Sequence, residues 1–325
     1  MRFLGLLAVG VLTDDIEITK KWLKNYLGYG YILTSYVKEE QGITTKTEII
    51  LHSGGGLPIV LKQRINGIRV AGKLSNISSL GPLAFKLGAN SLLPQYLEMK
   101  LNKLPLLTKI KKNPLDNNCF WFVDNYGNFF QVVETNHSFF SNSNVSGIFS
   151  VVIGVRDLDY ATEFFSSLGY SDVIFSGQGF FDDLEPLFAA ADRNYQVKRK
   201  ILRLKQGQIY GLKDFLGVSQ LDLVQILSPQ HQQQTIDKYS LYFLVDQTYN
   251  RPRKFYYQYR VRDDSDFTYL ITPWKLQDFM TVNLIDLQQI RIKQTFTIDL
   301  RYKYSNKTLP SKKLQMYILR LLDKI

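Results

Sequence analysis

The sequence predicts an α+β fold in which a unit of one strand and one amphipathic helix occurs twice, followed by a β-rich C-terminal part. The first observation is that the segment 150–170 repeats the pattern of the segment 8–29. The second is that residues 236–325 alternate apolar and polar side chains with period two and end in one helical pattern. Internal repeats of this size indicate similar supersecondary units that pack together.

Each repeat predicts a strand, a turn and a short helix. The run Val151–Val155 is rich in β-branched residues, and Asp157 follows it at the position of a helix cap. Asp15 matches Asp157, and Leu-Gly-Tyr ends both repeats. The apolar residues at helical spacing in the second repeat are Leu158, Ala161, Phe165 and Leu168. We therefore predict that both aspartates cap helices and have no catalytic role.

Composition limits the class of protein. The chain has 325 residues, 45% of them hydrophobic, which is long enough for about two domains with a large core. Cys119 is the single cysteine, so no internal disulfide forms, and we expect a reducing, cytoplasmic compartment. The apolar N-terminus could pass for a secretory signal, but it matches Phe149–Val155 and is predicted to be a strand. No apolar run reaches the length of a membrane span.

Further elements follow each repeat. The predicted strands after the first repeat are Tyr31–Tyr36, Thr45–Leu51 and Leu83–Leu87, with a helix at Leu92–Leu101 whose apolar face is Leu93, Tyr96, Leu97 and Met99. The lysines that follow this helix are predicted to be solvated surface. Aromatic and β-branched runs on both sides of the turn Asp124–Asn128 predict a β-hairpin over Cys119–Glu134.

The chain is expected to form three parts, with boundaries at the polar segments 135–146 and 228–235. The predicted parts are 1–135, 147–228 and a basic β-rich domain at 236–325. The strands expected after the second repeat are 173–175, 197–204, 220–227, 241–245, 254–262, 267–271 and 290–302, with a final helix at 311–325. From Asp237 to Ile325 there are sixteen Lys/Arg against nine Asp/Glu, which supplies about +7 of the net charge of +11.

The motifs resemble those of the vicinal-oxygen-chelate superfamily, which includes glyoxalase I, bleomycin-resistance proteins and extradiol dioxygenases. The resemblance is carried by a strand followed by Asp-Leu-x-x-Ala-x-x-Phe-Phe and Leu-Gly-Tyr, and by a later hairpin that ends in Gln-Val-Val-Glu. It covers about residues 3–228. It implies two βαβββ modules whose curved sheets enclose a cleft.

The resemblance also implies positions for a metal. Family members hold a divalent metal with a His on the first strand and a Glu on the last strand of a module, and the metal acts as a Lewis acid. The matching positions here are Ala8, Ser150, Gln131 and Asp222. Only Asp222 is a strong ligand, and one carboxylate does not hold a catalytic metal. We therefore predict neither a catalytic metal nor a cofactor.

What remains is the binding of a small apolar or aromatic molecule in the cleft. The predicted cleft residues are Ala8, Gly10, Gln131, Val133, Ser150, Val152 and Asp222. Asp222 has two open interpretations. In an apolar cleft its pKa would rise and it could act as a general base, whereas at a sheet edge it would be an ordinary exposed acid.

Two other hypotheses stay open at this point. A metal-dependent lyase or dioxygenase could use displaced metal ligands with His52 as the candidate, although His52, His137 and His231 are each predicted to lie at the surface. Alternatively, the C-terminal part could carry the function, because the aromatic and basic residues of 254–262 suit single-stranded nucleic acid or an anionic glycan. That part could also be a degenerate further module, since 241–246 resembles an opening strand. The sequence does not indicate how many copies of the chain associate.

Overall fold

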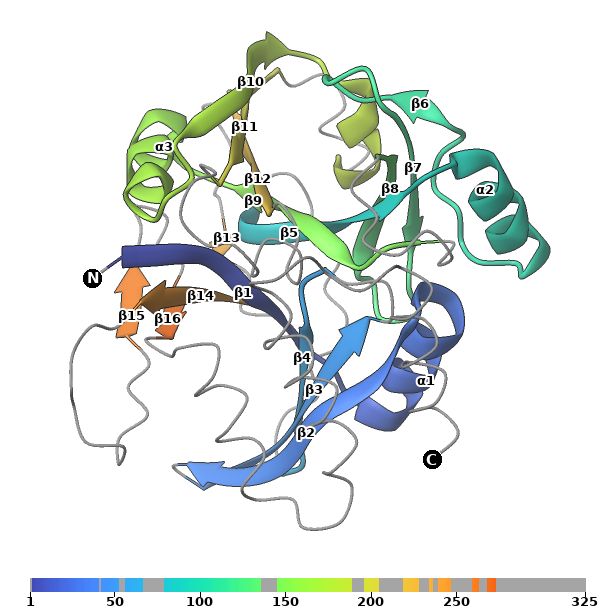
Figure 1. Ribbon diagram of the computed structural model, residues 1–325, viewed down its shortest axis with the longest axis vertical. Helices are drawn as coiled ribbons and strands as arrows, with labels where there is room; N and C mark the ends of the chain where they lie inside the picture. Colours follow the sequence, from blue (N-terminus) through green and yellow to red (C-terminus); the bar gives the residue numbers. More distant parts are fainter. Residues whose placement is uncertain are drawn as a thin grey trace, which may run out of the picture.

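The computed structural model describes residues 2–40, 42–52, 56–66, 79–135, 145–188, 196–204, 219–227, 234–235, 239–246, 259–262 and 268–272. Two large β-sheets dominate this part of the chain, with short helices against them (Figure 1). One sheet has the strand order β15-β16-β14-β1-β4-β3-β2, and the other has the order β10-β11-β12-β9-β5-β8-β7-β6, with β13 paired to β5. The predicted α+β class is confirmed.

The elements of the seven-stranded sheet are β1 (Arg2–Leu12), α1 (Ile16–Leu27), β2 (Tyr29–Glu40), β3 (Ile43–His52), β4 (Ile59–Arg64), β14 (Tyr239–Asp246), β15 (Tyr259–Arg262) and β16 (Thr268–Thr272). Those of the nine-stranded sheet begin with β5 (Ser79–Ala89), α2 (Leu92–Leu101), β6 (Lys111–Lys112), β7 (Asn118–Val123) and β8 (Phe129–Glu134). They continue with β9 (Ile148–Gly154), α3 (Leu158–Ser167), β10 (Asp172–Gly179), the 3-10 helix η1 (Asp182–Leu187), β11 (Val197–Arg203), β12 (Gln220–Ile226) and β13 (Gln234–Thr235).

Three stretches of the chain share one βαβββ topology. In each, the first strand lies parallel to the last: β1 beside β4, β5 beside β8 and β9 beside β12. The remaining two strands then continue the sheet outward in antiparallel order. Residues 1–135 therefore contain two such units, where the sequence analysis expected one. The third unit falls within the predicted span 147–228.

The described part of the C-terminal region repeats this strand pattern. Strand β14 pairs antiparallel with β1, just as β9 pairs antiparallel with β5. Strand β16 lies parallel to β14, and β15 pairs antiparallel with β16. These strands take the places of the first, last and third strands of a fourth unit, which agrees with the hypothesis of a degenerate module. The predicted strand at 290–302 and helix at 311–325 lie outside the described residues.

The capping role predicted for both aspartates is confirmed. The Asp15 carboxylate accepts a hydrogen bond from the backbone N–H of Ile18, and that of Asp157 accepts from Asp159 and Tyr160. Gly28 then ends α1 in the left-handed conformation, at φ 74°. The segment Asp15–Gly28 thus carries its own start and stop signals, and the same holds for its repeat.

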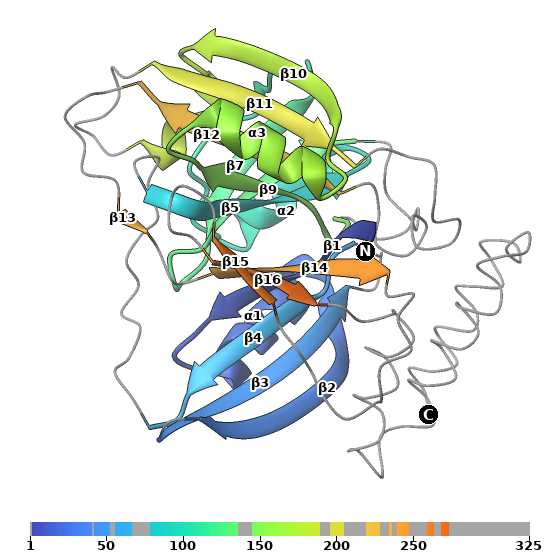
Figure 2. The same cartoon turned by 90° about the vertical axis from the view of Figure 1, so that its left-hand side faces the viewer.

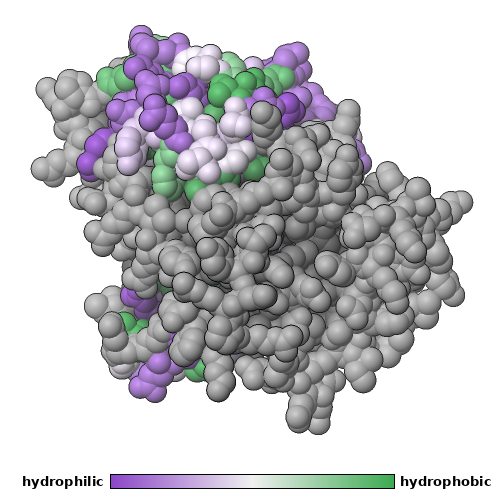
Figure 3. All heavy atoms as spheres, turned by 60° about the vertical axis from the view of Figure 1, so that its left-hand side comes forward, coloured by the Kyte–Doolittle hydropathy of each residue, from purple (hydrophilic) through white to green (hydrophobic). Residues whose placement is uncertain are grey.

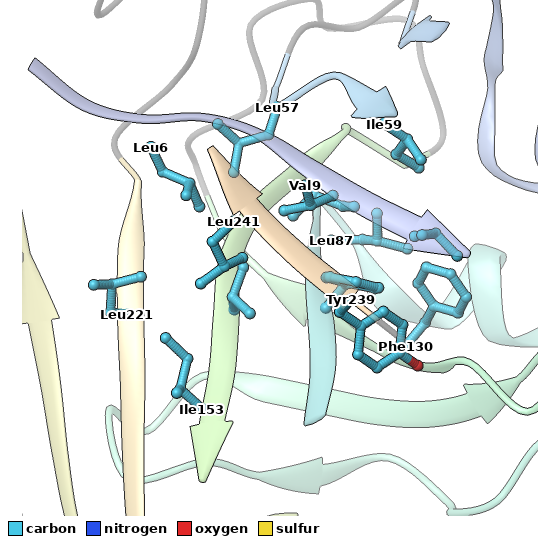
Figure 4. Packing of buried hydrophobic residues seen from close by; sticks show 14 of the residues in the cluster. Leu6, Val9, Leu57, Ile59, Leu87, Phe130, Ile153, Leu221, Tyr239 and Leu241 are labelled. Carbon is cyan, nitrogen blue, oxygen red and sulfur yellow. The ribbon is translucent and has the colours of Figure 1, made fainter. Parts of the chain in front are cut away.

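The two sheets lie one above the other (Figure 2), and one apolar core contains side chains from both of them. Leu6, Val9 and Leu241 of the seven-stranded sheet face Leu87, Ile153 and Leu221 of the other sheet (Figure 4). Helix α1 adds Trp22, whose ring stacks on Phe130 with the ring centroids 6.0 Å apart. The opposite face of the nine-stranded sheet carries a second set of buried side chains, which do not belong to this core.

Two tyrosines at the same position of the two repeats form hydrogen bonds to backbone groups of the other repeat's first strand. Tyr29 and Tyr170, which end the two Leu-Gly-Tyr motifs, are both fully buried. The Tyr29 hydroxyl accepts a 2.8 Å hydrogen bond from the backbone N–H of Ile148, where β9 begins. The Tyr170 hydroxyl accepts a 2.7 Å bond from the N–H of Leu6 in β1. Each repeat thus satisfies a backbone donor in the first strand of the other.

Replacing Tyr170 by phenylalanine is expected to destabilise the protein by about 1–3 kcal/mol, because the N–H of Leu6 would be left buried without its acceptor. The measurement is the free energy of unfolding in urea. Tyr160 of α3 is 50% exposed, and Tyr160→Phe provides the control with the same change in chemistry. Equal losses in the two variants would contradict the proposed role of the buried hydroxyl.

Candidate functional site

The site lies on the face of the nine-stranded sheet that does not pack against the other sheet. Lys86 in the middle of β5 is opposite Gln131 of β8 and opposite Ser150 of β9. Ser150 is in turn opposite Gln220 of β12, two residues before Asp222. Because opposite residues of paired strands share a face, these side chains form one polar row across four adjacent strands.

A buried charge network occupies the centre of this row. Lys86 Nζ lies 2.6 Å from Asp222 Oδ2. Arg199 of β11 binds the same carboxylate through Nε at 2.8 Å and Nη2 at 2.6 Å. Its Nη1 and Nη2 also bind Asp183 of η1, at 2.7 and 2.9 Å. These four side chains are at most 3% exposed, and their two cations and two anions balance.

Helix η1 covers the network. Its Asp183 provides the second carboxylate for Arg199, and the backbone oxygen of Asp183 accepts hydrogen bonds from the indole of Trp121 and the amide of Gln131. Leu184 and Leu187 pack into an apolar cluster on the same face. The remaining buried members of this cluster are Leu83, Ala84, Trp121, Phe129, Val152, Val197, Val224 and Ile226. The ion pair with Arg199 therefore fixes η1 over an otherwise apolar surface.

Asp222 is not the general base that one interpretation expected. Burial acts to raise its pKa, but Arg199 and Lys86 outweigh burial and lower the pKa to about 2. The other interpretation, an exposed acid at a sheet edge, is also wrong, because β12 lies between β11 and β9 and the side chain is fully buried. Asp222 is thus a permanently charged partner of two cations. It does not exchange protons near neutral pH.

Two oxygen atoms beside the network have no partner within the described part of the chain. They are Gln131 Oε1 and Ser150 Oγ, which are both fully buried and lie on the strands that flank Lys86. The amide nitrogen of Gln131 contacts the Cys119 sulfur at 3.3 Å. Burial and the nearby Asp183 raise the pKa of the Cys119 thiol to about 12, so this sulfur stays protonated at neutral pH.

The structure separates the predicted cleft residues into two groups. Four of them, at positions 131, 150, 152 and 222, gather on the face described above, and Val133 packs beside Cys119 in a small adjoining cluster. Ala8 and Gly10 lie in β1 of the other sheet, opposite Tyr242 and Ser240 of β14. A side chain at Gly10 would meet Ser240 Cβ at 2.9 Å. These two residues therefore do not contribute to the site.

His52 was predicted at the surface and is in fact 4% exposed, in β3 of the seven-stranded sheet. Its ring lies edge-on to Tyr29, with the centroids 5.0 Å apart. Burial lowers its pKa to about 4, with hydrogen bonds to the backbone of Leu27 and Val145 opposing the shift. A neutral core histidine in the other sheet does not supply a displaced ligand near Asp222. His137 and His231 lie outside the described residues.

The residues at the expected metal positions do not fit a divalent metal. Asp222 already uses both oxygens on Lys86 and Arg199, and Gln131 and Ser150 are weak neutral donors. An ammonium group also lies between them and would repel a cation. In the described ranges, no group of three or more His, Cys, Asp or Glu side chains converges on one point.

Sequence reasoning missed three members of the network: Lys86, Arg199 and Asp183. Two of them leave a signal. Lys86 interrupts the apolar strand pattern Leu83–Leu87, and Arg199 shares its strand face with Val197 and Ile201 under period-two alternation. A charged residue at an inward position implies a buried partner. Asp183 follows an irregular segment, and no comparable pattern marks it.

The paired βαβββ units give this chain a fold similar to that of solved glyoxalase I and dioxygenase structures. Glyoxalase I from Zea mays has a TM-score of 0.53 to this chain at 10% identity, covering 87% of this chain and 96% of that chain. A putative dioxygenase from Bacillus subtilis has a TM-score of 0.54 at 10% identity, covering 100% and 97%. No sequence-family model and no curated protein matches the chain. The likeness is one of fold.

Proposed function

We propose that this chain is a small-molecule-binding protein of the vicinal-oxygen-chelate fold that works without the metal centre that the family resemblance implies. The observation that carries the proposal is the pair of buried oxygens, Gln131 Oε1 and Ser150 Oγ, beside Lys86. A buried polar atom without a partner costs about 1–3 kcal/mol, and a polar group of a ligand would relieve that cost.

The surroundings favour a ligand with an apolar or aromatic body and one hydroxyl or amide group. Aromatic and aliphatic side chains, including Trp121, Phe129 and Val152, cover the same sheet face. The charge network is already neutral, so a ligand needs no formal charge to match it. Access requires η1 to move, because Asp183 and Leu184 cover this face.

The experiment compares p-cresol with toluene. The two molecules share the methyl-substituted ring, and p-cresol has one additional hydroxyl. We expect p-cresol to raise the Tm of the purified chain and toluene to raise it less. Gln131→Leu and Ser150→Ala should remove the difference. Gln95→Leu in α2 makes the same change at another buried glutamine and should retain it.

Two results would overturn the proposal. The first is an equal response of the unaltered chain and of all the variants to both molecules. The second is a stoichiometric transition metal in the purified protein, measured by elemental analysis. The binding of single-stranded nucleic acid or an anionic glycan by the C-terminal part stays a separate prediction, because most of that region lies outside the described residues.

A further inference from the structure

Helix α2 exposes a row of leucines on the side that faces away from the protein. Leu93, Leu97 and Leu101 follow at intervals of four, so they lie on one side of the helix. They are 59%, 48% and 82% exposed. The opposite side of the helix is buried, through Leu92, Gln95 and Met99. Of the apolar face predicted for this helix, Met99 is buried, whereas Leu93 and Leu97 are exposed.

This leucine row differs from the exposed sides of the other two α-helices, although the chain near the ends of β2, β3 and β4 also exposes Tyr36, Val37, Ile43 and Ile65. Helix α1 exposes one large aliphatic side chain, Ile18, and α3 exposes one large ring, Tyr160. The face that carries α3 and β10 shows hydrophilic side chains with hydrophobic ones scattered between them (Figure 3). Single exposed apolar residues are ordinary, whereas a contiguous set on one element indicates an interaction surface.

Lysines border the leucine row. Lys100 precedes Leu101 within the helix, and Lys103 follows the end of the helix; both are exposed. Residues 92–103 contain these two lysines and one acidic residue, Glu98, whereas the later Lys111 and Lys112 pair with Glu185 and Asp116. The surface therefore combines apolar side chains with an excess of positive charge.

We propose that α2 binds the surface of an anionic lipid bilayer, with the three leucines inserted among the acyl chains and the lysines against the headgroups. A helix of this length spans only about 15 Å, and one row of leucines offers far less than the roughly 800 Å² per partner of a standard protein interface. A helix at a lipid interface inserts its apolar side by about 5–10 Å, and attraction to anionic headgroups adds to the apolar area that it buries. The basic border matches negative headgroups. Within the described residues, no helix is long and apolar enough to cross a membrane.

The test is sedimentation of the full chain with vesicles of phosphatidylcholine alone or mixed with phosphatidylglycerol. We expect binding to the anionic vesicles that weakens with added salt. Leu97→Glu should reduce this binding by about tenfold or more, because a carboxylate would enter the acyl region. Ile18→Glu on α1 introduces the same charge at a side chain of similar exposure, 55%, and should leave the binding nearly unchanged.

Three outcomes overturn the proposal. One is no binding to anionic vesicles by the unaltered chain. Another is binding that Leu97→Glu leaves intact, which would assign it to a different basic region. The third is a dimer in sedimentation velocity that Leu97→Glu dissociates, which would assign the leucine row to a second copy of this chain.

Discussion

Asp222→Ala is expected to destabilise the protein by about 3–5 kcal/mol, the largest single effect that the structure predicts. The carboxylate binds both Lys86 and Arg199 in full burial. Its removal leaves two buried cations to share the one carboxylate of Asp183. The free energy of unfolding in urea, measured near neutral pH, tests the prediction.

The control is Asp172→Ala, which breaks an ion pair with Arg203 on the same sheet. Both of those side chains are more than one third exposed, so the loss should be about 1 kcal/mol or less. A second variant, Lys86→Met with Asp222→Asn, removes one cation and one anion together. The double variant should be more stable than Asp222→Ala. If its loss of stability equals the sum of the losses of the single variants Lys86→Met and Asp222→Asn, the two residues are not coupled.

At the position where the family resemblance implies a metal, the network brings together four charged side chains that neutralise one another. Four strands place polar side chains toward one another, and burial makes unpaired charge costly there. In this chain Lys86 supplies a positive charge that is covalently part of β5, and Asp222 is its anionic partner. Arg199 and Asp183 then balance the remaining charges. The arrangement is neutral, and beside it Gln131 Oε1 and Ser150 Oγ have no hydrogen-bond partner among the described residues.

The sequence predicts the first and third units because their signals are local. Asp15 and Asp157 cap their helices, and a glycine follows each helix to allow a positive φ. The second unit was missed since α2 lacks these signals. Ser91 makes no side-chain cap, and Lys103 takes the positive-φ position with φ 55°. Individual strands of the second unit can be predicted from the sequence. Their grouping into a separate unit cannot.

The site could be predicted only in part for the same reason. Gln131, Ser150 and Asp222 were found because the motifs fix their places on strands. Ala8 was paired with Gln131 because residues 1–135 were expected to form one unit. The strand pairing shows that Lys86 takes that place. Which strand lies beside which depends on contacts between distant segments, and period-two alternation carries no information about that.

The stability of the protein is expected to fall by about 2 kcal/mol from about pH 7 to about pH 5 through His52 alone. Burial lowers its pKa in the folded protein to about 4, below the value of about 6.5 in an unfolded chain. Between these values the unfolded chain binds a proton that the folded protein excludes. Stability therefore decreases as pH falls through this window. Asp222, whose pKa is lowered to about 2, contributes its own loss only at lower pH.

His52→Gln should flatten this pH dependence, even though the variant is less stable at every pH. The ring lies against Tyr29, and a side chain at Gly28 would meet His52 Nε2 at 2.8 Å, so the pocket has no room for a hydrated imidazolium. His137→Gln, in the segment predicted as a linker, is the matched control and should keep the full dependence. Urea unfolding at several pH values measures both variants. An unaltered slope in His52→Gln would mean that another group titrates in this window and that the buried histidine is not responsible.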